Sequence, residues 1–191
     1  MKKTIVFLLA MLMLTLTACG DKDSSLQRPD NGGSSSAPSA KVSEPAKTSN
    51  HVVDYKVDVP EGFESMEQEG VVECWYNADG SNINVNITEG TDNETFSSIN
   101  ADLMRLALVA AFKDSGGGEP TITDRYFTTN EVCGLPAYQY SYEIELAGQA
   151  MTQIIVCVNA DQTYTFTYTT TGDQWLETFE ASAAAIELTV E

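Results

Sequence analysis

Histidine is almost absent from this chain of 191 residues, in which His51 is the only one. Nucleophile pairs of the Ser–His or Cys–His type need a histidine as the base, and zinc sites usually need several His or Cys ligands. No glycine-rich phosphate loop follows a predicted strand either. Two carboxylates could serve a hydrolase, but a strongly acidic chain brings some pairs together by chance. The sequence therefore predicts a protein that is not an enzyme, with no cofactor and no metal site.

Basic residues are also scarce. The whole chain has a formal net charge of −18, and the part from Val52 onward carries four basic residues against 24 acidic ones. Nucleic acids and anionic lipid surfaces attract proteins through basic patches, so this part of the chain is repelled by both. We therefore expect no nucleic-acid partner, and we expect any attachment to a membrane to come from outside the acidic part.

The N-terminal segment has no apolar run long enough to cross a bilayer as a helix, which needs about 20 residues. Its apolar stretch from Ile5 to Leu14 is shorter, follows Lys2 and Lys3, and leads into small residues. A charged start, a short apolar middle and a small-residue end are the parts of a secretory signal peptide. We predict a signal peptide over residues 1–18.

The expected cleavage point, Leu16-Thr17-Ala18-Cys19-Gly20, resembles the lipobox of bacterial lipoproteins. The resemblance implies that the chain is cut before Cys19 and that Cys19 carries lipid, with acyl chains such as palmitate. It also implies that the mature protein is anchored in the cell membrane and faces the extracytoplasmic side. The alternative is an ordinary signal peptide with an incidental cysteine at this position.

The segment that follows is rich in Ser, Gly, Pro, Ala and Lys and has almost no large apolar residue. Such a composition cannot bury enough surface to offset its ordering entropy, so residues 19–51 are predicted to be a disordered tether. As a random coil, the tether would span roughly 30 Å. The predicted organisation is thus a signal peptide (1–18), a lipidated cysteine with its tether (19–51), and one domain (52–191).

Three cysteines remain in the domain: Cys74, Cys133 and Cys157. An odd number cannot form a closed disulfide framework, and no pair has the C-x-x-C spacing. Cys74 and Cys157 fall on the apolar faces of predicted strands, where a free cysteine behaves as a small hydrophobic residue. Cys133 lies in a predicted turn. The sequence leaves open whether any two of the three form a disulfide.

Alternation of apolar and polar residues predicts strands, and apolar residues at 3–4 spacing predict helices. The predicted strands cover 51–59, 71–77, 82–88, 121–128, 137–146, 151–158 and 163–170, and the predicted helices cover 94–114 and 173–188. Short loops join several neighbouring strands, which favours antiparallel pairing. We therefore predict an α+β fold, with a largely antiparallel sheet of about six to seven strands packed against two main helices.

The domain resembles the PsbP/DcrB-like domains that are common in bacterial lipoproteins. The opening strand and turn, Tyr55-Lys56-Val57-Asp58-Val59-Pro60-Glu61-Gly62-Phe63, carries the resemblance first. The Asp79-Gly80 hairpin, the stretch Gly134-Leu135-Pro136-Ala137-Tyr138 and the closing Trp175-Leu176-x-x-Phe179 also fit. These motifs are structural and extend over about Val52 to Glu191. The resemblance implies a PsbP-like α/β sandwich and brings no catalytic residues with it.

The Asp79-Gly80 pair predicts a hairpin turn between the second and third strands. Pairing across this turn places Trp75, Asn82, Asn84 and Asn86 on one face, with the apolar residues on the other. An aromatic ring beside amides could bind a sugar, so these four residues are the candidate ligand face. The alternative is that a helix or the loop 64–70 covers Trp75. The oxygen-rich stretch 77–82 weakly resembles a calcium loop, but the hairpin explains the same residues.

The most consistent interpretation is a lipid-anchored extracytoplasmic protein with a non-enzymatic binding or envelope-associated domain. The alternative is a cell-surface receptor that captures carbohydrate or peptide on the polar face around Trp75. The membrane is the one partner that the sequence suggests, through lipid on Cys19. The ligand is unknown, and the domain is expected to be a monomer.

Overall fold

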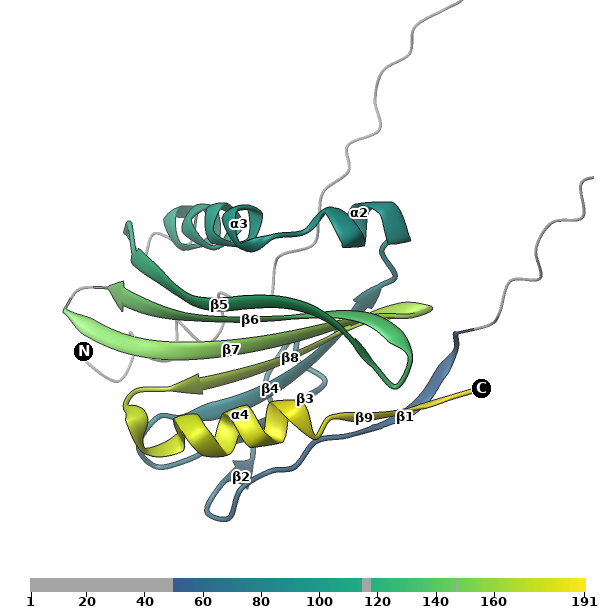
Figure 1. The fold of residues 1–191 in the computed structure, drawn as a ribbon. Helices are drawn as coiled ribbons and strands as arrows, with labels where there is room; N and C mark the ends of the chain where they lie inside the picture. Colours follow the sequence, from purple (N-terminus) through teal and green to yellow (C-terminus); the bar gives the residue numbers. More distant parts are fainter. Residues whose placement is uncertain (1–49, 115–117, 147) are drawn as a thin grey trace, which may run out of the picture.

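Strands predominate in the computed structural model, which describes residues 50–114, 118–146 and 148–191 (Figure 1). The first half contains β1 (Val52–Lys56), β2 (Glu64–Ser65), β3 (Glu73–Tyr76), β4 (Asn82–Glu89), α2 (Asn93–Ser98) and α3 (Ala101–Asp114). The second half contains β5 (Thr121–Val132), β6 (Leu135–Leu146), β7 (Gln149–Asn159), β8 (Gln162–Thr170), the 3₁₀ turn η2 (Asp173–Trp175), α4 (Leu176–Ala184) and β9 (Glu187–Val190).

Seven of the strands form one antiparallel sheet in the order β2-β3-β4-β8-β7-β6-β5. Strands β5 to β8 follow one another as a meander, because each is joined to the next by a short turn. The turn between β5 and β6 has Cys133 and Gly134 at φ of 52° and 78°, as a type I′ hairpin requires. Strands β1 and β9 pair antiparallel in a separate two-stranded sheet.

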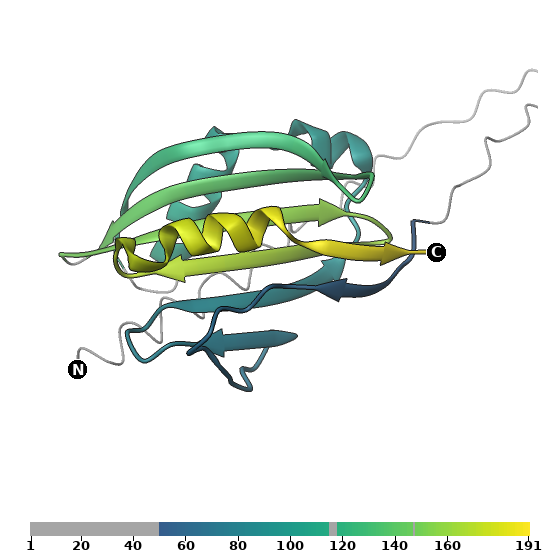
Figure 2. The same cartoon turned by 60° about the horizontal axis from the view of Figure 1, so that its bottom comes forward.

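Helices cover both faces of the large sheet (Figures 1 and 2). Helices α2 and α3 lie on one face, and α4 with the β1–β9 pair lies on the other. Helix α3 also contacts the edge strand β5. There Arg105 is paired with Asp124 (2.5 Å), whose other carboxylate oxygen accepts from the Tyr140 hydroxyl (2.5 Å). These contacts fix the helix over one half of the sheet.

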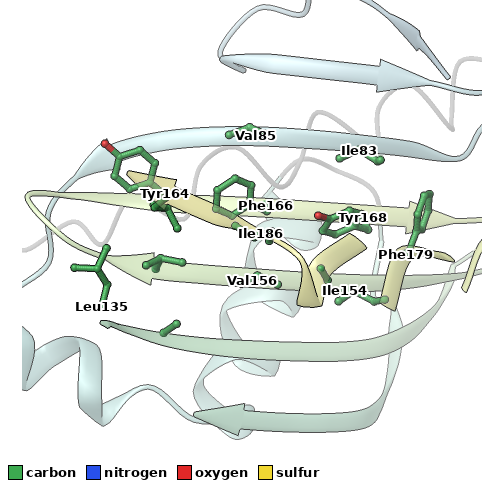
Figure 3. Close-up of a cluster of buried hydrophobic side chains, with 14 of the residues drawn as sticks. Ile83, Val85, Leu135, Ile154, Val156, Tyr164, Phe166, Tyr168, Phe179 and Ile186 are labelled. Atoms are coloured by element: carbon green, nitrogen blue, oxygen red, sulfur yellow. The ribbon is translucent and has the colours of Figure 1, made fainter. Parts of the chain in front are cut away.

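The larger apolar core lies between α4 and the sheet (Figure 3). Tyr168 and Phe179 are both fully buried, with ring centroids 5.5 Å apart. Strands β4, β7 and β8 supply most of the sheet side of this core: Ile83, Val85, Ile154, Val156, Val158, Tyr164 and Phe166. Burial of this many apolar side chains is the main stabilising term of the fold.

A second core lies between α3 and the strands β5 to β7. Met104, Leu108 and Phe112 point from α3 toward Tyr138, Tyr140 and Tyr142 of β6. The three tyrosines, which alternation along the strand predicts to point inward, are buried. The 3–4 spacing of Phe96, Ile99, Leu103, Leu106 and Ala110 predicts the main buried stripe of the helix, with Met104, Leu108 and Phe112 as a second apolar side. In the structure the second side is the buried one on α3. Leu103 and Leu106 are 49% and 66% exposed.

Two elements differ from the sequence-based prediction. The single helix expected over 94–114 is two helices, because Ile99 is extended and Asn100 caps α3 by accepting from the Leu103 N–H (3.1 Å). The closing helix is shorter than expected, and the chain after it forms β9 against β1. The predicted fold class is nevertheless confirmed: a mostly antiparallel sheet with a few helices, as in a PsbP-like α+β fold.

Candidate functional site

The predicted ligand face does not form as expected, because the hairpin register differs by one residue. Trp75 pairs with Ile83, and Cys74 pairs with Asn84. Residues directly opposite each other in an antiparallel pair point to the same face. Trp75 is therefore on the face opposite Asn82, Asn84 and Asn86, and placing the four together was wrong.

The slip has a local cause in the loop between β3 and β4. The sequence suggested four loop residues, whereas the Asn77 N–H donates to the Ser81 carbonyl (2.9 Å) and closes a five-residue loop. One extra loop residue shifts the register by one, and a shift of one moves every side chain of a strand to the other face. Trp75 is half-buried against the α4-side core as a result.

The three asparagines lie on the α3 face of the sheet. Asn82 and Asn84 are buried, and Asn86 is half-buried. Their strand pairs with β8 so that they stand opposite Thr169, Thr167 and Thr165. We call this set the amide–hydroxyl strip: Asn82, Asn84, Asn86, Thr165, Thr167 and Thr169. The strip lies on β4 and β8. On the same face of the sheet, β5 to β7 carry the apolar core under α3.

Hydrogen bonds connect the strip to its neighbours. The Asn84 amide donates to Asn82 (3.1 Å) and accepts from the Cys74 thiol (2.7 Å). Burial raises the pKa of the Cys74 thiol to about 11, so this thiol is protonated and can donate. Gln153 donates to Thr169 (2.9 Å) and accepts from the Tyr142 hydroxyl (2.7 Å). These hydrogen bonds give the Asn84 and Gln153 side chains partners within the sheet, whereas the buried Nε2 of Gln68 and Oγ of Ser141 have none among the described residues.

Sequence reasoning missed Gln153 and Gln68 as members of this network. Gln153 was an isolated polar residue in an apolar strand, which was a usable signal. Gln68, in the loop after β2, accepts from the Tyr76 hydroxyl (3.1 Å) and lies 3.5 Å from the Cys74 sulfur. No local pattern identifies Gln68, because its partners are placed by the path of the loop.

The oxygen-rich stretch 77–82 is a structural turn and not a calcium loop. Asp79 accepts from the Ser81 N–H (2.8 Å), from the Trp175 indole Nε1 (2.8 Å) and from the Gln174 amide. Desolvation of the Asp79 carboxyl opposes its ionisation, but these hydrogen bonds outweigh it and lower its pKa. Among residues 50–114, 118–146 and 148–191, no three His, Cys, Asp or Glu side chains gather as metal ligands would.

The cysteines and the histidine are placed as separate groups. Cys74 and Cys157 are buried, Cys133 is exposed, and all three are free thiols. Burial also raises the pKa of Cys157. His51 Nδ1 lies 2.6 Å from an Asp161 carboxylate oxygen, at the start of the domain. The structure therefore does not bring His51 and a cysteine together as a nucleophile pair.

The proposed lipidation residue, Cys19, and the predicted signal peptide lie outside the described residues. Within the described part of the chain, no helix has the length and apolar character to cross a membrane.

Comparison with known proteins supports the fold. No protein-family profile matches the chain, and no curated protein matches it. Among solved structures, the cyanobacterial PsbP (CyanoP) from Synechocystis sp. PCC 6803 matches with a TM-score of 0.55 at 15% identity, over 78% of this chain and 99% of that one. This likeness shows a PsbP-like fold and no more, because the identity is low.

Two further structures match more weakly. A Bacteroides thetaiotaomicron protein has a TM-score of 0.44 at 13% identity, over 72% of this chain and 46% of that one. LpqN, described as involved in cell envelope biogenesis of Mycobacterium tuberculosis, has a TM-score of 0.43 at 11% identity, over 71% of this chain and 83% of that one. Neither likeness is close enough to carry an argument about function.

Proposed function

We propose that this protein is a lipid-anchored extracytoplasmic protein whose PsbP-like domain acts by binding and not by catalysis. The observation that carries the proposal is the N-terminal sequence. Lys2 and Lys3 precede a short apolar run that ends at Leu16-Thr17-Ala18-Cys19, and 31 residues then separate Cys19 from His51. This order fits a lipid on Cys19, a tether, and a domain held away from the membrane surface.

The arrangement of reactive groups supports a role in binding. Cys74 and Cys157 are buried thiols with raised pKa, so they are poor nucleophiles at neutral pH. His51 contacts Asp161, and Asp79 accepts hydrogen bonds from η2. Each of these groups is hydrogen-bonded to a residue of the fold, and none of them forms a nucleophile–base pair.

Replacement of the lipidated cysteine tests the anchor. The Cys19→Ser variant should appear in the soluble fraction or remain uncleaved, and it should no longer incorporate labelled palmitate. Cys133→Ser is the matched control, because it removes an exposed cysteine from the domain and leaves Cys19 in place. If Cys19→Ser stays with the membrane in the same proportion as the wild type, the anchor is not the lipid on Cys19.

A receptor for carbohydrate or peptide is the second candidate. Trp75 no longer supports it, and the remaining support is the less buried end of the amide–hydroxyl strip at Asn86 and Thr165. Amides and hydroxyls hydrogen-bond uncharged polar ligands such as sugars. Cosedimentation with purified peptidoglycan tests this candidate. Asn86→Asp should reduce binding. Thr178→Asp, which adds the same charge on the exposed surface of α4, should not. Equal binding by both variants would exclude the amide–hydroxyl strip as the binding site.

A further inference from the structure

Helix α3 has a second apolar side, which faces away from the sheet. Met104, Leu108 and Phe112 are buried against the sheet, whereas Leu103 and Leu106 are exposed. At 3.6 residues per turn, Leu106 points almost directly away from the buried side. Figure 1 shows α3 at the outside of the described part of the chain. The outer side of this helix is therefore open to solvent.

Leu103, Leu106 and Ala110 make up this side, and we call them the outer stripe. Ala110 is exposed like the two leucines, and the 3–4 spacing places all three on one side of the helix. Arg105 lies on a different flank, because it pairs with Asp124 of the edge strand β5. Contiguous exposed apolar side chains are typical of interaction sites, whereas single ones are ordinary.

Two opposite charges stand near the two ends of the outer stripe. Asp102 is at the start of α3 and Lys113 is near its end, and their side chains are 78% and 49% exposed. They are 11 residues apart (113 minus 102), which is about three turns, so both lie on the flank beside Leu106. Asp102 pairs with Arg105, and Lys113 lies 3.1 Å from Glu119. Exposed pairs of this kind are weak, so both charges can take a further partner.

We propose that the outer stripe packs against the outer stripe of a second copy of the chain. The two α3 helices run antiparallel about a two-fold axis at the middle of the helix, which keeps each flank on its own side. This arrangement sets Asp102 of one copy beside Lys113 of the other. Leu103 of one copy lies beside Ala110 of the other, offset by about 3 Å along the helix. The two Leu106 side chains meet near the axis.

Charge complementarity favours a second copy as the occupant. Because both copies carry the same two charges, the two-fold makes the contact between Asp102 and Lys113 twice. Antiparallel helices also set the positive end of each helix dipole beside the negative end of the other. An anionic lipid surface is a poorer occupant, because the strongly acidic domain is repelled by it.

The contact should be weak. A contact confined to α3 buries less than the 1,200–2,000 Å² that is typical of specific complexes, and the acidic domains repel each other. The proposal departs from the monomer expected from the sequence, because the apolar spacing predicts that Leu103 and Leu106 are buried within one domain. It does not rest on the lipid anchor, although anchoring would raise the local concentration of both copies.

Cysteine crosslinking between two full-length copies with different tags tests the contact. Both copies carry Leu106→Cys in a Cys133→Ser background, which removes the exposed thiol of the domain. Oxidation should join the two tags, because the two-fold brings position 106 of both copies together. Thr178→Cys in the same background is the matched control, because Thr178 is exposed on α4, far from the outer stripe. It should give no crosslinking above the Cys133→Ser background.

Charge reversal in the Leu106→Cys copies tests the register. Asp102→Lys in both copies sets like charges together twice and should lower the crosslinked fraction about tenfold, and Lys113→Asp in both copies should do the same. One Asp102→Lys copy with one Lys113→Asp copy has opposite charges at both contacts, so this mixed pair should restore crosslinking. Circular dichroism and melting temperature establish that each variant is folded.

Three results would overturn the proposal. The first is that Leu106→Cys copies crosslink no more than Thr178→Cys copies, which would leave the outer stripe to a different protein. The second is that both charge reversals leave crosslinking unchanged. The third is that the mixed pair crosslinks no better than the two matched pairs, because a loss without restoration would show that these charges do not meet across the contact.

Discussion

Phe179 is the large apolar side chain that α4 buries in the core. It is fully buried and contacts the rings of Tyr168, Phe63 and Trp175. Phe179→Ala removes its transfer energy and leaves a cavity, and should cost about 3–5 kcal/mol of unfolding free energy. Leu106→Ala, at an exposed position of α3, should change it by less than about 0.5 kcal/mol. Urea denaturation measures both, and similar losses would contradict the placement of the core.

Contacts between residues far apart in the sequence decide where single side chains lie. Alternation along β6 and β8 predicts that Tyr140, Tyr142, Phe166 and Tyr168 are buried, and they are. The same type of pattern misplaced Trp75, because a strand alone does not show how many residues its turn contains. Local alternation therefore predicts which residues share a strand face, and only the pairing shows which face of the neighbouring strand joins them.

Asp79 makes stability dependent on acid. Its hydrogen bonds lower its folded pKa despite desolvation, so its contribution is present above the unfolded pKa and is lost as pH falls through the folded value. Asp79→Asn removes this contribution. We expect the variant to be less stable than the wild type at pH 7, with a difference that shrinks below about pH 4. A difference that stays constant between pH 7 and pH 3 would show that the charge does not matter.

Elements were predicted well where their residues alternate regularly and poorly where the chain changes direction. The break between α2 and α3 depends on the Asn100 cap, in a stretch whose apolar spacing fits one continuous helix. Strand β9 was missed because four residues after a helix give little pattern, and its partner β1 is at the other end of the domain. Long-range pairing determined both the closing strand and the edge position of β5.

Gly90 lies where the end of β4 approaches the turn between β7 and β8. A Cβ at Gly90 would lie 2.4 Å from the Asp161 carbonyl oxygen. Gly90→Ala must therefore move backbone, and we expect a lower melting temperature. Gly172→Ala is the control, because nothing lies within 4 Å of its Cβ position and its φ of −164° suits any residue. Equal melting temperatures for both variants would mean that the approach is looser than the distance indicates.

The α+β class and the size of the sheet were predictable from the sequence, because both depend on the number and order of the helices and strands. Function depends on the positions of single side chains, and the candidate ligand face was wrong because the β3–β4 register differs by one residue.

The division into tether and domain remains a prediction. A fragment from Asn50 to Glu191 should unfold cooperatively at the melting temperature of the longer chain. A large loss on removing residues 20–49 would show that the tether contributes to the core.

Lipid on Cys19 is the proposed anchor of the protein, and mass spectrometry of the mature N-terminus detects that lipid. The protein is isolated from membranes in detergent, digested, and its N-terminal peptide is measured. We predict a peptide that begins at Cys19 and carries the added mass of a diacylglycerol on the thiol. An unmodified Cys19 within a longer peptide, or a mature N-terminus at another residue, would show that the protein is not anchored through Cys19.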